Sequence, residues 1–137
     1  MSVMALSKEE VFVIHAAAIE RFGGLDGLRD EGLLDSAPAQ PFQTFDGADL
    51  YPSAIDKACR YAFGIMSAHP FTDGNKRTGA ALLGAYLRMS GIDFRPGYAV
   101  FLKAMLDAAA GPVSYDALVG WVNGVVDQEI SQPAAHP

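Results

Sequence analysis

One run of residues, from His69 to Gly79, holds most of the groups in this chain that could carry out chemistry. The run reads His-Pro-Phe-Thr-Asp-Gly-Asn-Lys-Arg-Thr-Gly and lies between two apolar segments of helical periodicity. A polar loop that leads into a helix places unpaired backbone N–H groups at the positive end of the helix dipole, where an anion binds favourably. The run therefore predicts an anion-binding loop.

The side chains of this loop indicate that the anion is a phosphate group. Gly74 permits a close approach of the backbone, and Lys76 and Arg77 add two positive charges to an otherwise acidic protein. Asp73 supplies a hard oxygen ligand of the kind that Mg²⁺ uses when it bridges substrate phosphates. His69 supplies an imidazole that can accept a proton from an attacking hydroxyl near neutral pH. The spacing alone predicts a phosphate site with a candidate general base.

The nine residues from His69 to Arg77 resemble the signature of the Fic/Doc family, H-P-F-x-[D/E]-G-N-[G/K]-R, at all eight specified positions. The resemblance is strongest to the Doc (death on curing) branch, the toxin half of toxin–antitoxin pairs. Lys76 stands where most Fic AMP-transferases have glycine, and the chain is near the minimal Doc length. The resemblance extends, less sharply, over about residues 7–127.

The resemblance implies a toxin that transfers a phosphoryl group from ATP to a hydroxyl of a target protein. It suggests a translation elongation factor as the target and growth arrest as the outcome. His69 would be the general base, Asp73 would hold Mg²⁺ against the phosphates, and Arg77 would pair with a terminal phosphate. The anion nest would be formed by the backbone amides of Gly74, Asn75 and Lys76.

The resemblance also implies a flap, about Gln43 to Tyr51, that docks the target by strand addition. Its first residues are Gln43, Thr44 and Phe45. Phe42 and Phe45 fit either a place in the core or a contact with the target.

Two other functions stay open. A Fic-type AMP-transferase would attack the α-phosphate of ATP, but many of these enzymes carry a second arginine where this chain has Ala80. A non-catalytic Fic-fold binding module is disfavoured because the chain keeps His69, Asp73, Asn75 and Arg77.

Inhibition is expected to come from a separate protein. Autoinhibited Fic proteins carry the pattern [S/T]-x-x-x-E-[G/N], and the nearest candidate here, Glu31-Gly32, has Gly27 where Ser or Thr is required. We therefore expect a small antitoxin that acts in trans.

The elements that must position the loop are predicted to be helices. Helical periodicity runs from Ser7 to Gly23-Gly24, Ser53 to Met66, Thr78 to Ser90, Tyr98 to Ala110, and onward from Ser114. A shorter helix is expected from about Asp30 to Ala37, because Pro38 and Pro41 prevent a longer one. Between Pro41 and Pro52, the dipeptide Asp46-Gly47 predicts a β-hairpin turn. These elements predict one all-α domain with a hairpin flap over 1–130, followed by a disordered tail over 131–137. The resemblance implies that the helices form the compact bundle of the Fic fold.

Composition excludes several other classes. The 137 residues carry a net charge of −6, whereas a nucleic-acid-binding protein normally presents a basic face. No run of about 18 apolar residues is present to cross a membrane. The single cysteine, Cys59, excludes an internal disulfide and fits a reduced, cytoplasmic compartment. Cys59 and His15 fall on apolar helical stripes, which predicts a buried packing thiol and a satisfied core histidine.

Overall fold

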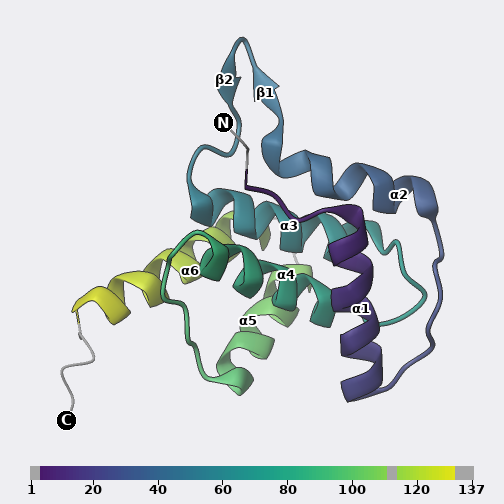
Figure 1. Cartoon of the computed structure of the whole chain (residues 1–137). Helices are drawn as coiled ribbons and strands as arrows, with labels where there is room; N and C mark the ends of the chain where they lie inside the picture. The colour runs from purple at the N-terminus through teal and green to yellow at the C-terminus, as the bar shows by residue number, and fades with distance from the viewer. Residues whose placement is uncertain (1–3, 111–113, 132–137) are drawn as a thin grey trace.

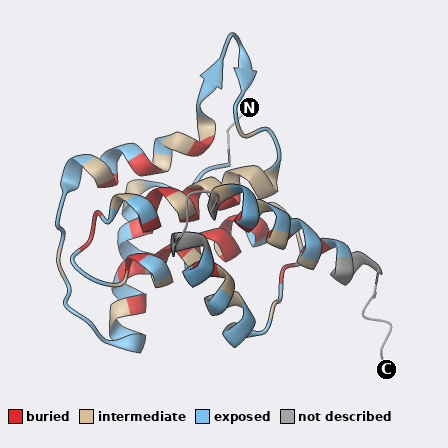
Figure 2. Ribbon diagram, turned by 180° about the vertical axis from the view of Figure 1, so that it is seen from behind, coloured by how far each residue is buried: buried red, intermediate tan, exposed pale blue. Residues whose placement is uncertain are grey.

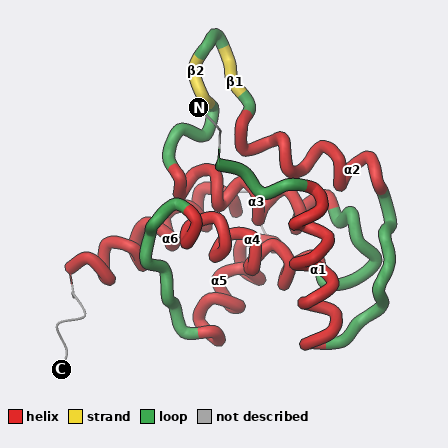
Figure 3. The backbone as a smooth tube through the Cα atoms, in the orientation of Figure 1, coloured by secondary structure: helices red, strands yellow, loops and turns green. Residues whose placement is uncertain are grey.

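The computed structural model describes residues 4–110 and 114–131. In chain order its elements are α1 (Lys8–Phe22), α2 (Glu31–Ser36), a 3₁₀ helix η1 (Ala37–Phe42), β1 (Thr44–Phe45), β2 (Ala48–Asp49), α3 (Ala54–Ala68), α4 (Asn75–Met89), α5 (Tyr98–Ala110) and α6 (Ser114–Ser131). Within the described ranges the two short strands form the only sheet, and they project from the helical body (Figures 1 and 3). The predicted all-α class with a hairpin is confirmed.

The helices α3 and α4 form the centre of the bundle, and buried residues concentrate on them (Figure 2). They pack closely because Gly79 faces α3: a Cβ at this position would lie 3.0 Å from the carbonyl oxygen of Ala62 and 2.9 Å from Cγ of Met66. Leu82, Leu83 and Leu87 are buried on the same helix. The predicted helix from Thr78 to Ser90 thus belongs to the buried centre of the bundle.

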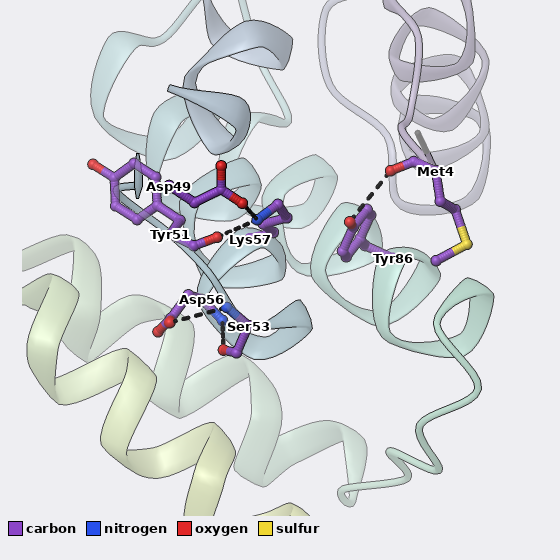
Figure 4. Close-up of polar contacts among 7 residues, drawn as sticks. All are labelled: Met4, Asp49, Tyr51, Ser53, Asp56, Lys57 and Tyr86. Atoms are coloured by element: carbon purple, nitrogen blue, oxygen red, sulfur yellow. Dashed lines mark hydrogen bonds and ion pairs between the residues drawn. The ribbon is translucent and has the colours of Figure 1, made fainter. Parts of the chain in front are cut away.

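Local sequence signals fix where α1 and α3 begin. Ser7 and Glu10 form a capping box at α1, and Ser53 and Asp56 form one at α3. In the second box the Ser53 hydroxyl accepts from the Asp56 amide at 3.0 Å, and the Ser53 amide donates to the Asp56 carboxylate at 3.4 Å (Figure 4). Each box satisfies N–H groups that a helix start leaves unpaired.

Two boundaries differ from the predicted ones. The helix α4 begins at Asn75 and not at Thr78, because Gly74 adopts a left-handed conformation (φ 79°) and caps the helix, so that three polar residues form its first turn. The apolar pattern marked only the later residues. The α-helix α2 ends at Ser36, but helical structure continues as the 3₁₀ helix η1 up to Phe42, beyond the predicted end at Ala37. Pro38 and Pro41 are accommodated in η1.

The predicted hairpin is confirmed. Thr44 pairs with Asp49 and Phe45 with Ala48 in an antiparallel register. The turn residues Asp46 and Gly47 both have positive φ, 51° and 81°, which is the geometry that an Asp-Gly hairpin turn favours.

The two residues assigned to the core lie there. His15 is 2 % exposed and Cys59 is fully buried.

No helix of the described ranges has the length and apolar character needed to cross a membrane. The tail predicted over 131–137 lies, from residue 132 onward, outside the described residues.

The stability of the fold should decrease at alkaline pH, because two buried groups hold their protons more tightly in the folded chain. Desolvation raises the pKa of the Cys59 thiol from 9.0 to about 12 and that of the Tyr61 phenol from 10.0 to about 12. Between pH 9 and 12 the unfolded chain loses these protons more readily than the folded chain, so raising the pH favours unfolding. We expect the free energy of unfolding, measured by urea denaturation, to fall across this window.

The variant Cys59→Ala, Tyr61→Phe should show a flatter fall over the same pH window. If the free energy of unfolding of the variant falls as steeply with pH as that of the parent chain, these two groups are not the cause of the fall.

Candidate active site

His69 lies at the junction where α3 ends, in a left-handed conformation (φ 54°, ψ 56°) that non-glycine residues seldom adopt. Its amide donates to the carbonyl of Ile65 at 3.1 Å and closes the helix. The guanidinium of Arg29 donates to the carbonyls of His69 at 2.5 Å and of Ala68 at 2.7 Å. A cation at a helix C-terminus also offsets the negative end of the dipole. Arg29 thus secures the backbone from which the exposed His69 imidazole projects.

A segment remote in sequence runs alongside the loop. The amides of Arg29 and Asp30 both donate to the carbonyl of Pro70, at 2.7 and 3.0 Å, and the amide of Thr72 donates to the carbonyl of Gly27 at 2.9 Å. Leu28 forms an isolated antiparallel bridge with Phe71. The loop between α3 and α4 is therefore held by backbone hydrogen bonds, as in a sheet, although it belongs to neither strand of the hairpin.

The side chain of Asn75 forms hydrogen bonds with both backbone groups of Phe71 in the loop. Its Oδ1 accepts from the Phe71 amide at 3.1 Å and its Nδ2 donates to the Phe71 carbonyl at 2.9 Å. Asn75 is 7 % exposed and Phe71 is 1 % exposed, so this pair satisfies backbone groups that water does not reach.

His15 joins the loop to α1. Its ring stacks on that of Phe71, with centroids 3.6 Å apart and planes within 5°, and its Nε2 lies 2.7 Å from the carbonyl oxygen of Asp73. This contact fixes the residue before Gly74, and so fixes the angle at which the chain enters α4.

The start of α4 has the features of an anion nest. Gly74 precedes the helix in a left-handed conformation, and the first-turn amides of α4 have no carbonyl acceptors within the helix. Lys76 is exposed at this turn, and Arg77 is half-buried with its guanidinium 4.1 Å from the ring centroid of Phe22. The nest and both cations face one open cleft of about 480 Å³.

All six residues predicted for chemistry line this cleft: His69, Asp73, Gly74, Asn75, Lys76 and Arg77. The structure thus brings the candidate base, the candidate metal ligand and the nest together around one space. The walls are completed from α1 and the turn after it, by Phe22, Gly23 and Gly24.

Asp73 is oriented by the backbone rather than by a cation. Its Oδ2 accepts from the amide of Leu25 at 3.0 Å, and its Oδ1 accepts no hydrogen bond from a described residue. No three His, Cys, Asp or Glu side chains of the described residues come together to hold a metal ion. A single carboxylate with one oxygen available fits Mg²⁺, which keeps several waters and completes its shell with substrate phosphates.

The predicted flap residues lie apart from the cleft. Gln43, Thr44 and Phe45 belong to the hairpin and its entry, and none of them lines the cleft. Phe45 is 75 % exposed, whereas Phe42 packs on the core with its ring 6.0 Å from that of Tyr61. The two phenylalanines are therefore divided between the surface and the core.

Two cations one turn apart on α3 hold the base of the hairpin. The ammonium of Lys57 contacts the carbonyl oxygen of Tyr51 and lies 3.3 Å from Oδ2 of Asp49 (Figure 4). The guanidinium of Arg60 donates to Oε1 of Gln40 at 2.9 Å and lies 5.4 Å from the ring centroid of Tyr51. Both ends of the hairpin are thereby tied to the central helix.

Sequence reasoning did not find the supporting residues. Nothing in the sequence marks Arg29 as the partner of His69, and His15 was recognisable only as a core histidine. The turn from Gly23 to Leu25 carried only the signal of a helix end, yet it forms a wall of the cleft and holds Asp73.

Comparison with known proteins gives consistent matches. The sequence model of the Fic/DOC family matches residues 5–87, which include the whole loop from His69 to Arg77. The chain is 37 % identical over 95 residues to "Toxin Doc" of Mycolicibacterium smegmatis, covering 69 % of this chain and 71 % of that protein. It is 29 % identical over 87 residues to "Protein kinase doc" of Escherichia phage P1, covering 64 % and 68 %.

The Asn75 side chain should dominate the stability of the loop. Asn75→Ala leaves a buried N–H and a buried C=O of Phe71 without partners, so we expect the free energy of unfolding to fall by about 2 kcal/mol or more. Urea denaturation measures this fall. Lys76→Ala, at the exposed neighbouring position, is the matched control and should cost about 0.5 kcal/mol or less. Equal losses of unfolding free energy in the two variants would show that the Asn75 hydrogen bonds do not stabilise the loop.

The hairpin should loosen when Lys57 loses its charge. Lys57→Met keeps the aliphatic stem but removes both contacts of the ammonium, worth about 1 kcal/mol, so local opening becomes about fivefold more frequent. Hydrogen exchange at the Leu50 amide, which donates to the Gln43 carbonyl at 2.9 Å, should quicken by that factor. The control is Lys103→Met, which removes an exposed ion pair with Asp107 on α5. An unchanged Leu50 rate would rule Lys57 out as the anchor.

Proposed function

The chain belongs to the Fic/DOC family, and on this premise we propose that it is a Doc-like toxin that transfers a phosphoryl group from ATP to a hydroxyl of a target protein. The observation that carries the proposal is the single cleft in which His69, Asp73 and the first turn of α4 meet. The names of the two relatives, a toxin and a protein kinase, support the same activity.

The residues of the cleft divide the work by their chemistry. His69 accepts the proton of the target hydroxyl as the hydroxyl oxygen bonds to the γ-phosphorus. The bond from that phosphorus to the β–γ bridging oxygen breaks, and ADP leaves. The first-turn amides after Gly74 hold the transferred phosphate, and Arg77 pairs with its oxygens. Phosphoryl transfer asks little covalent chemistry of a protein, so holding nucleophile and phosphate in line is the main task. The contacts of Arg29, His15 and Asn75 with the loop suit that task.

Asp73 is the residue that would hold Mg²⁺. When bound, the ion offsets the negative charge of the nucleotide phosphates. The Leu25 amide donates to Oδ2 of Asp73 and holds the carboxylate in place, so Oδ1 would be the metal ligand.

Lys76 and Ala80 favour the γ-phosphate over the α-phosphate. The long side chain of Lys76 stands at the edge of the nest, where it narrows the space and attracts the more highly charged terminal phosphate. Ala80 lacks the guanidinium that clamps a second phosphate in many Fic AMP-transferases. The protein is therefore proposed to be a kinase, with AMP transfer as the alternative that the experiment below distinguishes.

The hairpin is the proposed docking element for the target. Phe45 and Leu50 are 75 % and 50 % exposed, and the short strands leave unpaired backbone groups at their outer edges. A translation elongation factor is the proposed target, which would place the protein in the cytoplasm. A small antitoxin is the proposed inhibitor in trans.

Labelled ATP tests the activity directly. The chain is incubated with a bacterial lysate and ATP carrying the label at either the γ- or the α-phosphate, and the modified protein is identified by intact mass. We expect label from the γ-position only and a mass increase of one phosphate group. His69→Ala should lower the rate by about 10²–10⁴-fold, the usual cost of removing a general base.

Lys103→Ala, at an exposed position of α5 that does not line the cleft, is the control for this variant and should label the target as the parent does. Incorporation from the α-position would make the protein an AMP-transferase. No incorporation from either position would leave only the binding-module function.

A further inference from the structure

The His15 side chain of α1 is buried, yet its polar contact is with the loop that forms the cleft. The residue is 2 % exposed and shares the inward face of its helix with Val11 and Ala18. An apolar side chain at such a position would leave no polar group to satisfy. The proposed transfer step uses neither ring nitrogen of His15. A buried imidazole at this position therefore indicates a polar task outside that step.

The ring of His15 is held in one orientation. Its face stacks on Phe71, with ring centroids 3.6 Å apart and planes within 5° of each other, and Phe71 is held in turn by both hydrogen bonds of Asn75. A Cβ on Gly74 would lie 3.6 Å from Cδ2 and Nε2 of His15, so the edge of the ring also packs against the loop. A ring packed in this way cannot turn without displacing its neighbours. The direction of its Nε2 atom is therefore fixed.

Nε2 of His15 carries a proton in this arrangement. The atom lies 2.7 Å from the carbonyl oxygen of Asp73, and a carbonyl oxygen can only accept a hydrogen bond. A neutral imidazole has one N–H, so the neutral tautomer is the one with the proton on Nε2. Nδ1 lies 4.0 Å from the exposed Asp26 carboxylate, beyond hydrogen-bond distance. His15 is thus a donor with a fixed direction, and its acceptor is in the loop.

The acceptor belongs to the peptide group between Asp73 and Gly74, which is trans. In a trans peptide the C=O and N–H bonds point in opposite directions. The hydrogen bond from His15 holds the Asp73 carbonyl toward α1, and so directs the Gly74 N–H away from α1. Gly74 lines the cleft, and no described residue accepts a hydrogen bond from its amide. The Gly74 N–H is therefore a donor that a ligand in the cleft can use.

Gly74 does not fix this orientation by itself. Its φ is 79°, but glycine adopts negative φ about as readily. Half a turn of the Asp73–Gly74 peptide group would therefore cost little in the glycine backbone, and it would place the carbonyl oxygen where the N–H now lies. A carbonyl oxygen in that place would repel the oxygens of a phosphate. A contact from outside the loop must select the orientation that binds an anion, and His15 makes such a contact.

Resting on the proposed function, we infer that His15 is a positioning residue of the phosphate site. Its Nε2–H holds the Asp73–Gly74 peptide group so that the Gly74 N–H donates to an oxygen of the bound phosphate. His15 itself touches no substrate, because its ring is buried between α1 and the loop. The geometry of the anion nest thus depends on a side chain that lies 58 residues from Asp73 in the sequence.

Two substitutions separate the donor of His15 from its ring. His15→Gln places an amide N–H near the position of Nε2 but removes the aromatic ring, whereas His15→Phe keeps a ring that can stack on Phe71 and removes the donor. Asp26→Asn, which changes the exposed neighbour of the other ring nitrogen, is the matched control. The probe is inorganic tripolyphosphate in Mg²⁺ buffer, titrated while the Gly74 amide is followed by ¹H–¹⁵N correlation NMR.

We expect the Gly74 amide of the parent chain to shift on titration, and Asp26→Asn to bind the probe as the parent does. His15→Phe should bind it about tenfold more weakly, the effect of losing one hydrogen bond to a charged group, and His15→Gln should stay close to the parent. Urea denaturation should rank the two variants in the reverse order, because only His15→Phe keeps the buried aromatic ring. The same order in both measurements would show that binding follows the stability of the fold, and would overturn the inference.

The parent chain supplies a measurement that depends on no variant. Long-range ¹H–¹⁵N correlation of the imidazole should show a proton on Nε2 of His15. A proton on Nδ1 alone would overturn the inference, because Nε2 would then have no hydrogen to donate to Asp73.

The remaining outcomes separate this inference from the proposed function. If His15→Phe binds tripolyphosphate as tightly as the parent does, or more tightly than His15→Gln does, the donor of His15 does not position the nest. The inference is then overturned, while transfer of label from γ-labelled ATP by the parent still supports the proposed function. Failure of the parent to bind tripolyphosphate would also overturn the inference, and the proposed function would fall with it only if the parent transfers no label.

Discussion

The reversal of the chain between α3 and α4 is the constraint to which the rest of the structure is fitted. Two left-handed residues, His69 at the end of α3 and Gly74 before α4, turn the chain within six residues and bring two buried helices against each other. Such a reversal leaves carbonyl groups at the end of one helix and amides at the start of the next without helical partners. The carbonyls of Ile65, Ala68 and His69 accept hydrogen bonds from protein groups, and the first-turn amides of α4 are left facing the cleft.

The supporting contacts come from three directions and meet on the loop. Arg29 and the backbone from Gly27 to Asp30 hold one side, His15 reaches across from α1, and Asn75 closes the loop from within. Each gives a backbone group of the loop a hydrogen-bond partner, and those of Asn75 are buried, so stability and site geometry depend on the same hydrogen bonds. This dependence is also why a non-glycine residue can be held in a left-handed conformation at His69.

The distribution of charge separates the site from the rest of the surface. Elsewhere cations are held by carboxylates or by backbone oxygens, as Lys57 is at the base of the hairpin and Arg29 is at the end of α3. Among the described residues, none forms an ion pair or a hydrogen bond with the side chains of the α4 cations Lys76, Arg77 and Arg88, and the small residues Ala80, Ala81 and Gly84 lie between them. One helix thus supplies the features of an anion nest at its N-terminus and a run of small, apolar residues further along.

Local signals were sufficient for much of this protein. The loop from His69 to Arg77, the helix starts at Ser7 and Ser53, and the turn Asp46-Gly47 could all be predicted from the sequence, because each depends on residues a few positions apart. The start of α4 was misplaced by three residues because its signal was the conformation of Gly74 and not an apolar period.

Only the tertiary structure decided which residues support and extend the site. Arg29 lies 40 residues from His69 and His15 lies 58 from Asp73. The cleft joins the end of α1 to the loop and the start of α4. Contacts of this kind arise only when helices pack, since packing, and not local propensity, determines which faces meet.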